Sequence, residues 1–336
     1  ALMSRGLGDV YKRQMSSYVV ADQIANDFLS LDDSVLISEK AWRTGGSKMF
    51  IEQGKRVSVL DLLKGIIIQS GNDATVALAE YVGGTEDGFV DLMNSYAASM
   101  GLSNTLFQNS TGLPDGNHFS SAKDLATMTS LLIENFPETY SLYKEKYFEF
   151  NNIRQPNRNR LLWKDNSSDG VKTGHTESAG YCLISSAQRN EMRLIAVVAG
   201  AESDKERFND TQRLLEYGFR FYSTQEVIKK DNALKDVTVW GGKEDLVSLG
   251  SENNIKLTLP RTIFKNITIT YDFQNNLRAP IKEGQVLGTL IIKDGEKALH
   301  KENLVALNSV EAKGFFGRLW ANFVLWIRSL FGLGNA

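Results

Sequence analysis

Apolar positions recur at helical spacing through the first two thirds of the chain. One such run opens at Ser58, where Ser-x-x-Asp resembles a capping box, and continues to about Gln69. The turn-forming triplet over 70–72 ends that helix, and Asp73 is placed to cap a second helix that a Gly-Gly pair ends. The same periodicity predicts further helices over 85–100, 121–135 and 207–221.

The apolar pattern changes to that of strands in two places. Runs over 181–187 and 193–199 are rich in β-forming residues and flank a short polar turn, so they predict a hairpin. After Gln225, short alternating runs are separated by glycine-containing turns, which predicts a small antiparallel β domain. Its expected strands cover 237–240, 255–259, 267–271 and 287–292.

A third pattern occupies residues 310–336. Aromatic and aliphatic residues recur there at helical spacing, and the longest uncharged stretch, 319–327, is far shorter than the ~20 residues that span a bilayer. We therefore expect an amphipathic helix that lies in a membrane interface. The alternative is a helix that packs on the β domain or in a homodimer. The expected membrane-facing residues are Phe316, Trp320, Phe323, Trp326 and Ile327.

Composition narrows the class of protein. A chain of 336 residues with 42% hydrophobic and 23% charged residues is expected to fold as two domains. A net charge of -2 gives no reason to expect nucleic acid as a partner. The single cysteine, Cys182, excludes an internal disulfide and a thiolate zinc site, and it lies in an apolar run typical of a buried strand. The histidines are scattered, so we expect neither a metal nor another cofactor.

Two short motifs carry the candidate chemistry. Ser70-Gly71-Asn72 is followed, 102 positions after Ser70, by Lys172-Thr173-Gly174-His175. Each motif alone is common in turns or at strand starts, but their order matches two of the three signatures of penicillin-recognising serine acyltransferases. The third signature, Ser-x-x-Lys on a preceding helix, is missing.

With these motifs, the chain resembles the low-molecular-mass penicillin-binding proteins, which are D-alanyl-D-alanine carboxypeptidases of the bacterial periplasm. The resemblance begins at Met15 and is carried by segments 65–74, 153–163, 169–176 and 217–221. It implies an α+β fold: a transpeptidase/β-lactamase-like domain with an antiparallel sheet and helices, a small all-β domain, and an amphipathic helix. The corresponding ranges are 15–225, 226–309 and 310–336.

The resemblance also implies roles for individual residues. Ser70 would relay a proton to the leaving amine, and Asn72 would hold the catalytic lysine and the substrate amide. Lys172 and Thr173 would bind the free carboxylate of the substrate, and the strand after Gly174 would pair with its backbone. The remaining implied roles are the backbone N–H of His175 as half of an oxyanion hole and Arg207 as a further carboxylate ligand.

The implied substrate is a peptidoglycan pentapeptide, and β-lactams are the implied inhibitors. The implied location is the periplasm, with peripheral attachment to the outer face of the inner membrane through the amphipathic helix.

The chain departs from this family at the nucleophile. Counting back from Ser17, the nucleophile position holds Val10 and the base position holds Arg13. Valine has no hydroxyl, and arginine stays protonated, so we expect the chain as written to be inactive. Residues 1–14 lack the apolar core of a signal peptide and resemble translated adapter sequence, so we expect a non-native segment there.

The sequence allows three other interpretations. Literal Ser-x-x-Lys strings begin at Ser120 and Ser141, but both follow the Ser-Gly-Asn triplet, and we reject them as nucleophiles. A noncatalytic, membrane-bound peptidoglycan-binding module would suit Val10 as it stands. A serine β-lactamase uses similar motifs, although the β domain and the amphipathic helix favour a cell-wall enzyme.

Overall fold

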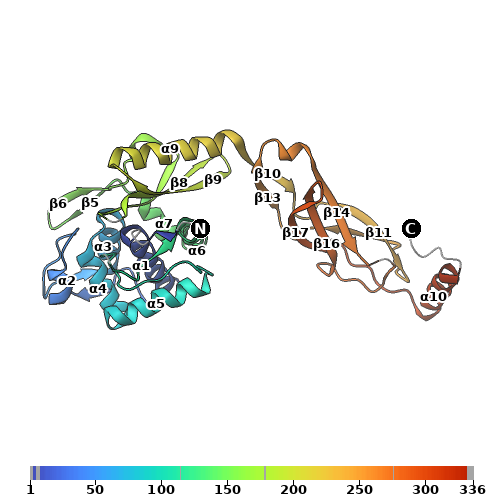
Figure 1. Cartoon of the computed structure of the whole chain (residues 1–336). Coiled ribbons are helices and arrows are strands. Elements are labelled where there is room, and N and C mark those ends of the chain that lie inside the picture. The colour runs from blue at the N-terminus through green and yellow to red at the C-terminus, as the bar shows by residue number, and fades with distance from the viewer. Residues whose placement is uncertain (1–2, 5–7, 114, 178, 275, 331–336) are drawn as a thin grey trace. The chain divides into compact units, whose positions relative to one another are not determined.

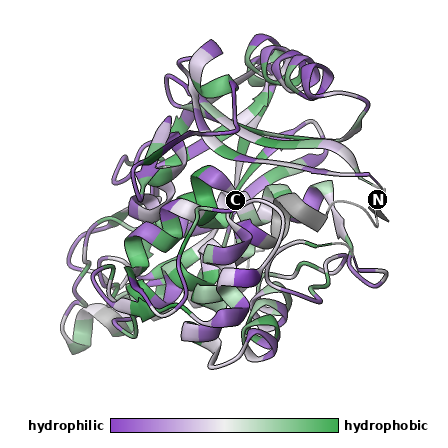
Figure 2. Ribbon diagram, turned by 90° about the vertical axis from the view of Figure 1, so that its left-hand side faces the viewer, coloured by the Kyte–Doolittle hydropathy of each residue, from purple (hydrophilic) through white to green (hydrophobic). Residues whose placement is uncertain are grey.

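The computed structural model describes residues 3–4, 8–113, 115–177, 179–274 and 276–330. The chain divides into two compact units, Ala1–Phe219 and Arg220–Ala336, shown in Figure 1. Each unit has its own cluster of buried apolar side chains. In Figure 2, hydrophobic positions concentrate where helices and strands meet, and hydrophilic positions concentrate on outer turns.

The N-terminal unit combines helices with short strands. Its helices are α1 (Gly8–Ala25), α2 (Glu39–Arg43), α3 (Val59–Lys64), the π-helical turn η1 (Gly65–Gln69), α4 (Asn72–Gly83), α5 (Glu86–Ser99), α6 (Ala122–Asn135), α7 (Pro137–Ser141), the 3-10 turn η2 (Leu142–Lys144), α8 (Leu161–Lys164) and α9 (Asp204–Phe221). Its strands are β1 (Met3–Ser4), β2 (Ser34–Leu36), β3 (Arg56–Ser58), β4 (Ser120–Ser121), β5 (Tyr147–Phe150), β6 (Ile153–Pro156), β7 (Ser168–Thr176), β8 (Gly180–Arg189) and β9 (Met192–Ala201).

Within the described ranges, β7, β8 and β9 form an antiparallel sheet in that order, so β7 lies at an edge. The predicted hairpin is therefore present, as β8 and β9. Arg189 pairs with Met192 across its turn, where Asn190 has a φ of 53°. Asparagine tolerates this left-handed conformation, which explains the tight connection.

The helix expected over 58–69 does not continue as one α-helix. Ser58 caps α3 as predicted, because its hydroxyl accepts a hydrogen bond from the N–H of Asp61 at 3.0 Å. From Gly65 the backbone widens into η1, and Ser70 then adopts a left-handed φ of 61°. A Cβ at Gly65 would lie 2.3 Å from the Sδ of Met49, so a larger residue there would force this buried side chain to move.

The predicted capping role of Asp73 is wrong. Helix α4 begins at Asn72, and Gly71 occupies its N-cap position without a side-chain hydrogen bond. The buried carboxylate of Asp73 instead accepts hydrogen bonds from the backbone N–H groups of Met49 and Phe50, each at 3.0 Å. The two N–H groups take the place of water around the buried carboxylate. They also fix the segment that contains Met49 and Phe50 against α4.

The C-terminal unit is rich in strands. These are β10 (Tyr222–Ile228), β11 (Lys235–Trp240), β12 (Leu246–Gly250), β13 (Ile255–Pro260), β14 (Ile267–Phe273), β15 (Leu277–Arg278), β16 (Val286–Asp294) and β17 (Lys297–Ala306). Among the described residues one sheet has the order β14-β16-β17-β12-β11-β15, and β10 pairs with β13. The expected antiparallel arrangement holds except between β11 and β15, which run parallel.

The amphipathic helix begins later than the sequence pattern indicates. Helix α10 spans Phe315–Leu330, after the 3-10 turn η3 (Ile263–Lys265) and the last strands of the unit. Val310 is buried in the β unit, and its backbone exchanges two hydrogen bonds of 2.9 Å with Ile281. Residues 310–312 thus belong to the β structure, because backbone pairing there replaces helical hydrogen bonds.

Candidate active site

The fold brings Ser70 and Lys172 into contact. Ser70 follows η1, Lys172 lies on β7, and both side chains are buried. The Nζ of Lys172 donates a hydrogen bond to the Oγ of Ser70 and a longer one, at 3.4 Å, to the carbonyl of Thr173. Two motifs that are distant in sequence therefore form one buried polar pair.

Asn72 lies beside this pair, at the start of α4. Its Nδ2 donates to the carbonyl of Gly45 at 2.8 Å, and its backbone N–H donates to the carbonyl of Ser47 at 2.8 Å. Its Oδ1 accepts a hydrogen bond from the NH1 of Arg13 at 2.7 Å. The amide is thus held on both sides, one of them by the residue at the expected base position.

Arg13 enters the site from α1 and is buried. Besides Asn72, its NH1 contacts the carbonyl of Ser70 at 2.8 Å. Burial lowers the pKa of Arg13 to about 9, and the charge of Arg158 adds to this effect. Arg13 is therefore still a cation at neutral pH and cannot accept a proton. The backbone of Val10 lies on the same helix, but its side chain is outside the described part of the chain.

The electrostatics of the site depress the basicity of Lys172. Burial holds the pKa of its ammonium well below the usual value, and the charges of Arg13, Arg158 and Arg207 act in the same direction. These causes are those of a lysine buried among other cations, and an anion bound beside the ammonium would favour its charged form.

The remaining residues of the second motif lie along β7. Thr173 and Gly174 are buried and pair with Leu183 and Cys182 of β8, respectively. The imidazole of His175 is exposed, with its ring centroid 4.0 Å from that of Tyr181. An exposed ring suits a role carried by the backbone N–H rather than by the side chain.

Arg207, on α9, is turned toward β7 and β8. Its NH1 donates to the carbonyl of Gly174 at 3.0 Å and to that of Cys182 at 3.4 Å, and its NH2 pairs with Asp204. The guanidinium therefore joins the two strands behind the motif. Carboxylate binding by Arg207 stays a prediction.

Sequence reasoning missed Arg158 and Asp73 as parts of the site. Arg158 makes no hydrogen bond or ion pair with its side chain among the described residues, yet its charge reaches both Arg13 and Lys172. The sequence feature that could have indicated Arg158 is the segment 154–160, which is rich in Arg and Asn. The signal for Asp73 was its position directly after Ser-Gly-Asn, where a helix cap was the simpler interpretation.

The two literal Ser-x-x-Lys strings have structural roles. The hydroxyl of Ser120 shares a 2.8 Å hydrogen bond with that of Thr105, and Ser121 caps α6. The hydroxyl of Ser141 donates to the carbonyl of Glu138, within α7, at 2.6 Å. Lys123 and Lys144 are not among the hydrogen-bond partners of these hydroxyls.

Helix α10 exposes its aromatic residues. The exposed fractions of Phe316 and Trp320 are 84% and 68%, and Phe323 and Trp326 are also exposed, whereas Ile327 is half-buried. The rings of Trp320 and Phe323 lie 5.9 Å apart, so they form one row. Of the described helices, none is long and apolar enough to cross a membrane.

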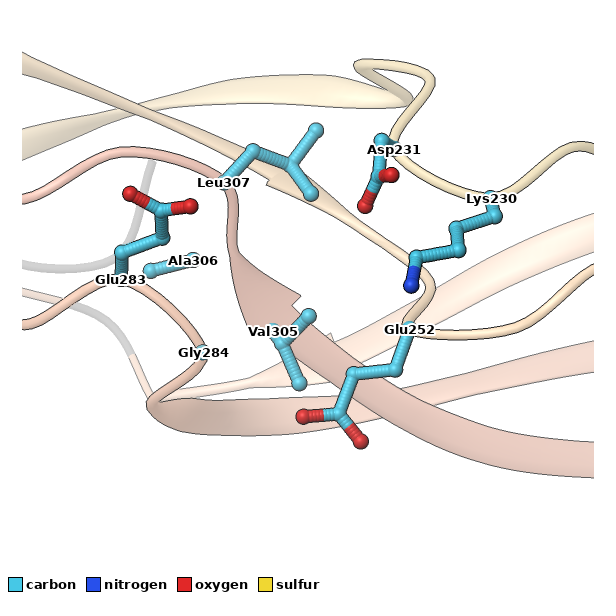
Figure 3. A pocket seen from close by; sticks show the side chains of 8 residues that line it. All are labelled: Lys230, Asp231, Glu252, Glu283, Gly284, Val305, Ala306 and Leu307. Atoms are coloured by element: carbon cyan, nitrogen blue, oxygen red, sulfur yellow. The ribbon is translucent and has the colours of Figure 1, made fainter.

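A cavity of about 440 Å³ lies in the C-terminal unit, where charged side chains surround the end of β17 (Figure 3). It is lined by Lys230, Asp231, Glu252, Glu283, Gly284, Val305, Ala306 and Leu307. Its carboxylates are not placed to hold a metal ion together, and the same holds for His, Cys, Asp and Glu side chains throughout the described ranges. None of the sequence-predicted catalytic residues lines it.

Comparison with known proteins identifies both units. Residues 12–203 match the D-alanyl-D-alanine carboxypeptidases of peptidase family S11, and residues 222–312 match the C-terminal domain of penicillin-binding protein 5. The chain is 45% identical over 326 residues to D-alanyl-D-alanine carboxypeptidase DacC of Escherichia coli K12, an alignment that covers 95% of this chain and 82% of that protein.

Solved structures agree. Penicillin-binding protein 5 from Haemophilus influenzae superposes with a TM-score of 0.80 at 40% identity and covers 89% of each chain. The ampicillin-bound form of penicillin-binding protein D2 from Listeria monocytogenes superposes with a TM-score of 0.59 at 30% identity, covering 65% of this chain and 88% of that one.

Proposed function

Because the chain belongs to the D-alanyl-D-alanine carboxypeptidase family of serine peptidases, we propose that its complete site removes the terminal D-alanine of peptidoglycan pentapeptides. The reaction proceeds through an acyl-enzyme on a serine at position 10, which β-lactams also acylate. The observation that carries this proposal is the buried contact between Lys172 and Ser70 beside Asn72.

Substrate binding is supported by the position of β7. This strand lies at the edge of its sheet, so an extended peptide can add to it by backbone hydrogen bonds. The positive charges of Lys172 and Arg158 and the hydroxyl of Thr173 suit the free carboxylate at the end of the peptide. This arrangement explains why a carboxypeptidase, rather than an endopeptidase, fits the site.

Proton transfer is supported by the surroundings of position 13. A lysine there would be buried on α1 one turn after a serine at position 10, and Arg158 and Lys172 would lower its pKa. As a neutral amine it would take the serine proton while the hydroxyl attacks the peptide carbonyl. Ser70, bonded to Lys172, would pass a proton to the leaving D-alanine amine.

The chain as written has a different outcome under this proposal. Val10 offers no nucleophile and Arg13 no base, so it binds the substrate carboxylate without forming an acyl-enzyme. We treat residues 1–14 as a non-native segment that replaced the first motif. The structural consequence is that Arg13 occupies the Oδ1 of Asn72, which the substrate amide would otherwise contact.

The experiment compares the chain as given with a repaired chain. In the repaired chain a family-like segment replaces residues 1–14 and carries serine at 10 and lysine at 13. We expect the repaired chain to release D-alanine from a pentapeptide ending in D-Ala-D-Ala, and the chain as given to release none. A folded repaired chain without activity would overturn the proposal.

We further propose that α10 docks the protein on the outer face of the bacterial inner membrane, in the periplasm. The exposed row of aromatic side chains supports this use, since Trp and Phe favour the membrane interface. The other occupant of this face is a second copy of the chain. Sedimentation without lipid separates the two, because a monomer supports the membrane and a dimer through α10 contradicts it.

A further inference from the structure

An aromatic and cationic cluster on the N-terminal unit has no role in the reaction described above. The rings of Tyr147 and Trp163 meet edge to face, with centroids 5.8 Å apart. The guanidinium of Arg154 lies 4.1 Å from the Tyr147 centroid, and the Nζ of Lys146 lies 5.9 Å from the ring of Trp163. We call Lys146, Tyr147, Arg154 and Trp163 the hairpin face, because all but Trp163 of α8 lie on or directly beside the β5–β6 hairpin of Figure 1.

The hairpin face is exposed and positively charged. Its two rings are 45% and 38% exposed, although the alternate side chain Phe148 is buried in the core. Neither Lys146 nor Arg154 forms an ion pair with a carboxylate in the part of the chain that the structure describes. Glu149 lies opposite Arg154 in the hairpin. Its negative charge offsets one of the two cations, so the net charge of the face stays positive.

Two carboxylates beside the hairpin face are engaged elsewhere, which leaves Glu149 as its acidic neighbour. Glu145 pairs with Lys64 at 3.1 Å, and Asp165 pairs with Arg189 at 3.2 Å. The cations of the hairpin face therefore remain available to an external anion. Exposed Trp, Tyr and Arg side chains together are the composition typical of binding hot spots, and folding alone does not explain them.

The hairpin is joined to both halves of the active site. The Nε2 of Gln69, directly before Ser70, donates to the carbonyl of Pro156 at the end of β6, at 2.9 Å. Three residues later, the Nδ2 of Asn159 donates to the carbonyl of Gly170 on β7, also at 2.9 Å. Between these two anchors lies Arg158. The hairpin is therefore fixed both to the residue before Ser70 and to the strand that carries Lys172.

We propose that the hairpin face binds the glycan-bearing part of the peptidoglycan strand whose peptide end occupies the active site. This inference rests on the proposed function. Stems on neighbouring disaccharides of the same strand carry carboxylates, which suit Lys146 and Arg154, and the sugar rings present C–H faces that pack on aromatic rings such as Trp163. The face thus discriminates a polymer-attached peptide from the free peptide.

The test measures binding to the chain as given, so that catalysis is not needed. The probes are a free pentapeptide and the same pentapeptide on a short glycan strand that carries a second stem, and calorimetry measures their binding. We expect the strand-linked probe to bind more tightly, and Tyr147→Ala combined with Arg154→Gln to weaken it about tenfold. The free pentapeptide should change less than about twofold, because it does not reach the face.

A matched control is Tyr81→Ala, since Tyr81 on α4 is also 45% exposed but lies outside the hairpin face. It should leave both affinities unchanged. Trp163→Phe, which keeps a ring, should retain most of the binding that Trp163→Ala loses.

Equal affinity of the chain for the two probes would overturn the inference. An equal loss of affinity for both probes in the variant that combines Tyr147→Ala and Arg154→Gln would overturn it as well. Binding of the hairpin face to anionic lipid vesicles instead of the saccharide would also contradict it. Failure of the proposed function looks different, because then the repaired chain would not hydrolyse even the free pentapeptide.

Discussion

The site around Lys172 and the row of aromatic residues on α10 differ in what they bury. The polar side chains of Ser70, Asn72 and Lys172 are buried, and each forms hydrogen bonds with the backbone or with another side chain. On α10, apolar side chains such as Phe316 and Trp320 are exposed. The first arrangement fixes geometry and shifts a pKa, whereas the second leaves surface for a partner.

This difference separates chemistry from attachment. A change in the site around Lys172 alters proton transfer or carboxylate binding, and its effect depends on a few hydrogen bonds. A change on α10 removes apolar area and leaves the N-terminal unit untouched, because each unit has its own core. The following predictions test this separation from either side.

The largest effect is expected for Lys172→Ala in the repaired chain. Losing the cation and the hydrogen bond to Ser70 should lower hydrolysis of a D-Ala-D-Ala peptide by about a thousandfold. The melting temperature should not fall in step with the rate, since removal of the amine also removes the cost of its desolvation. Steady-state kinetics and thermal unfolding provide the two readouts.

Lys123→Ala is the matched control for that variant. Lys123 belongs to a literal Ser-x-x-Lys string but lies exposed on α6. Its loss should leave the rate unchanged. A large loss of rate in Lys123→Ala, or none in Lys172→Ala, would mean that the site has been placed wrongly.

The next effect concerns α10. Removal of residues 314–336 should lower binding to anionic liposomes by at least about a hundredfold, because several exposed aromatic side chains each contribute roughly 1.5–3 kcal/mol when buried. The cut begins after Lys313, whose N–H bonds the carbonyl of Gly241 at 2.8 Å. Equal sedimentation of both forms with liposomes would reject membrane docking.

A cut before Val310 is the sharper comparison. It should also destabilise the C-terminal unit, because Val310 is buried there and pairs with Ile281. If both truncations unfold at the same temperature, the boundary between β structure and helix is not where the contacts indicate.

The smallest effect is a change in pH dependence. The pKa of Lys172 is lowered in the folded chain, so above that value the unfolded state binds a proton that the folded state does not. The free energy of unfolding should therefore rise with pH, up to the usual lysine value, by at most about 1.4 kcal/mol per pH unit. Lys172→Met should remove this slope in denaturant titrations between about pH 7 and 8, below the pKa of Arg13.

An unchanged slope in Lys172→Met would show that other groups carry the pH dependence. The exposed Lys123→Met serves as the control, since its ammonium is solvated in both states. The upper limit of the window matters, because above it Arg13 begins to contribute in the same direction.

Periodicity predicted the helices and the β8–β9 hairpin because local packing decides them. Ser58, Thr85 and Ser121 all act as N-caps with side-chain hydrogen bonds. The π-helical turn before Ser70 could not be predicted, since the apolar periodicity continues through it. The position of Asp73 misled because its carboxylate bonds the backbone N–H groups of Met49 and Phe50, which are distant in sequence.

The candidate site was predictable as far as motifs reach. Lys172 and Ser70 could be paired because their order and spacing match a known family, and the structure brings them together. The role of Arg158 could not be predicted, because its charge acts on Lys172 through space and no sequence pattern marks it. The parallel pairing of β15 with β11 was likewise invisible in a run of two residues.

The central claim is that the segment bearing Val10 and Arg13, in place of one bearing serine and lysine there, separates a binding site from an enzyme. Incubation with a fluorescent penicillin followed by mass spectrometry tests it most directly. We predict no covalent adduct on the chain as given, and an adduct on serine 10 of the repaired chain. A stable adduct on the unaltered chain, at Ser70, Ser120 or Ser141, would contradict the account.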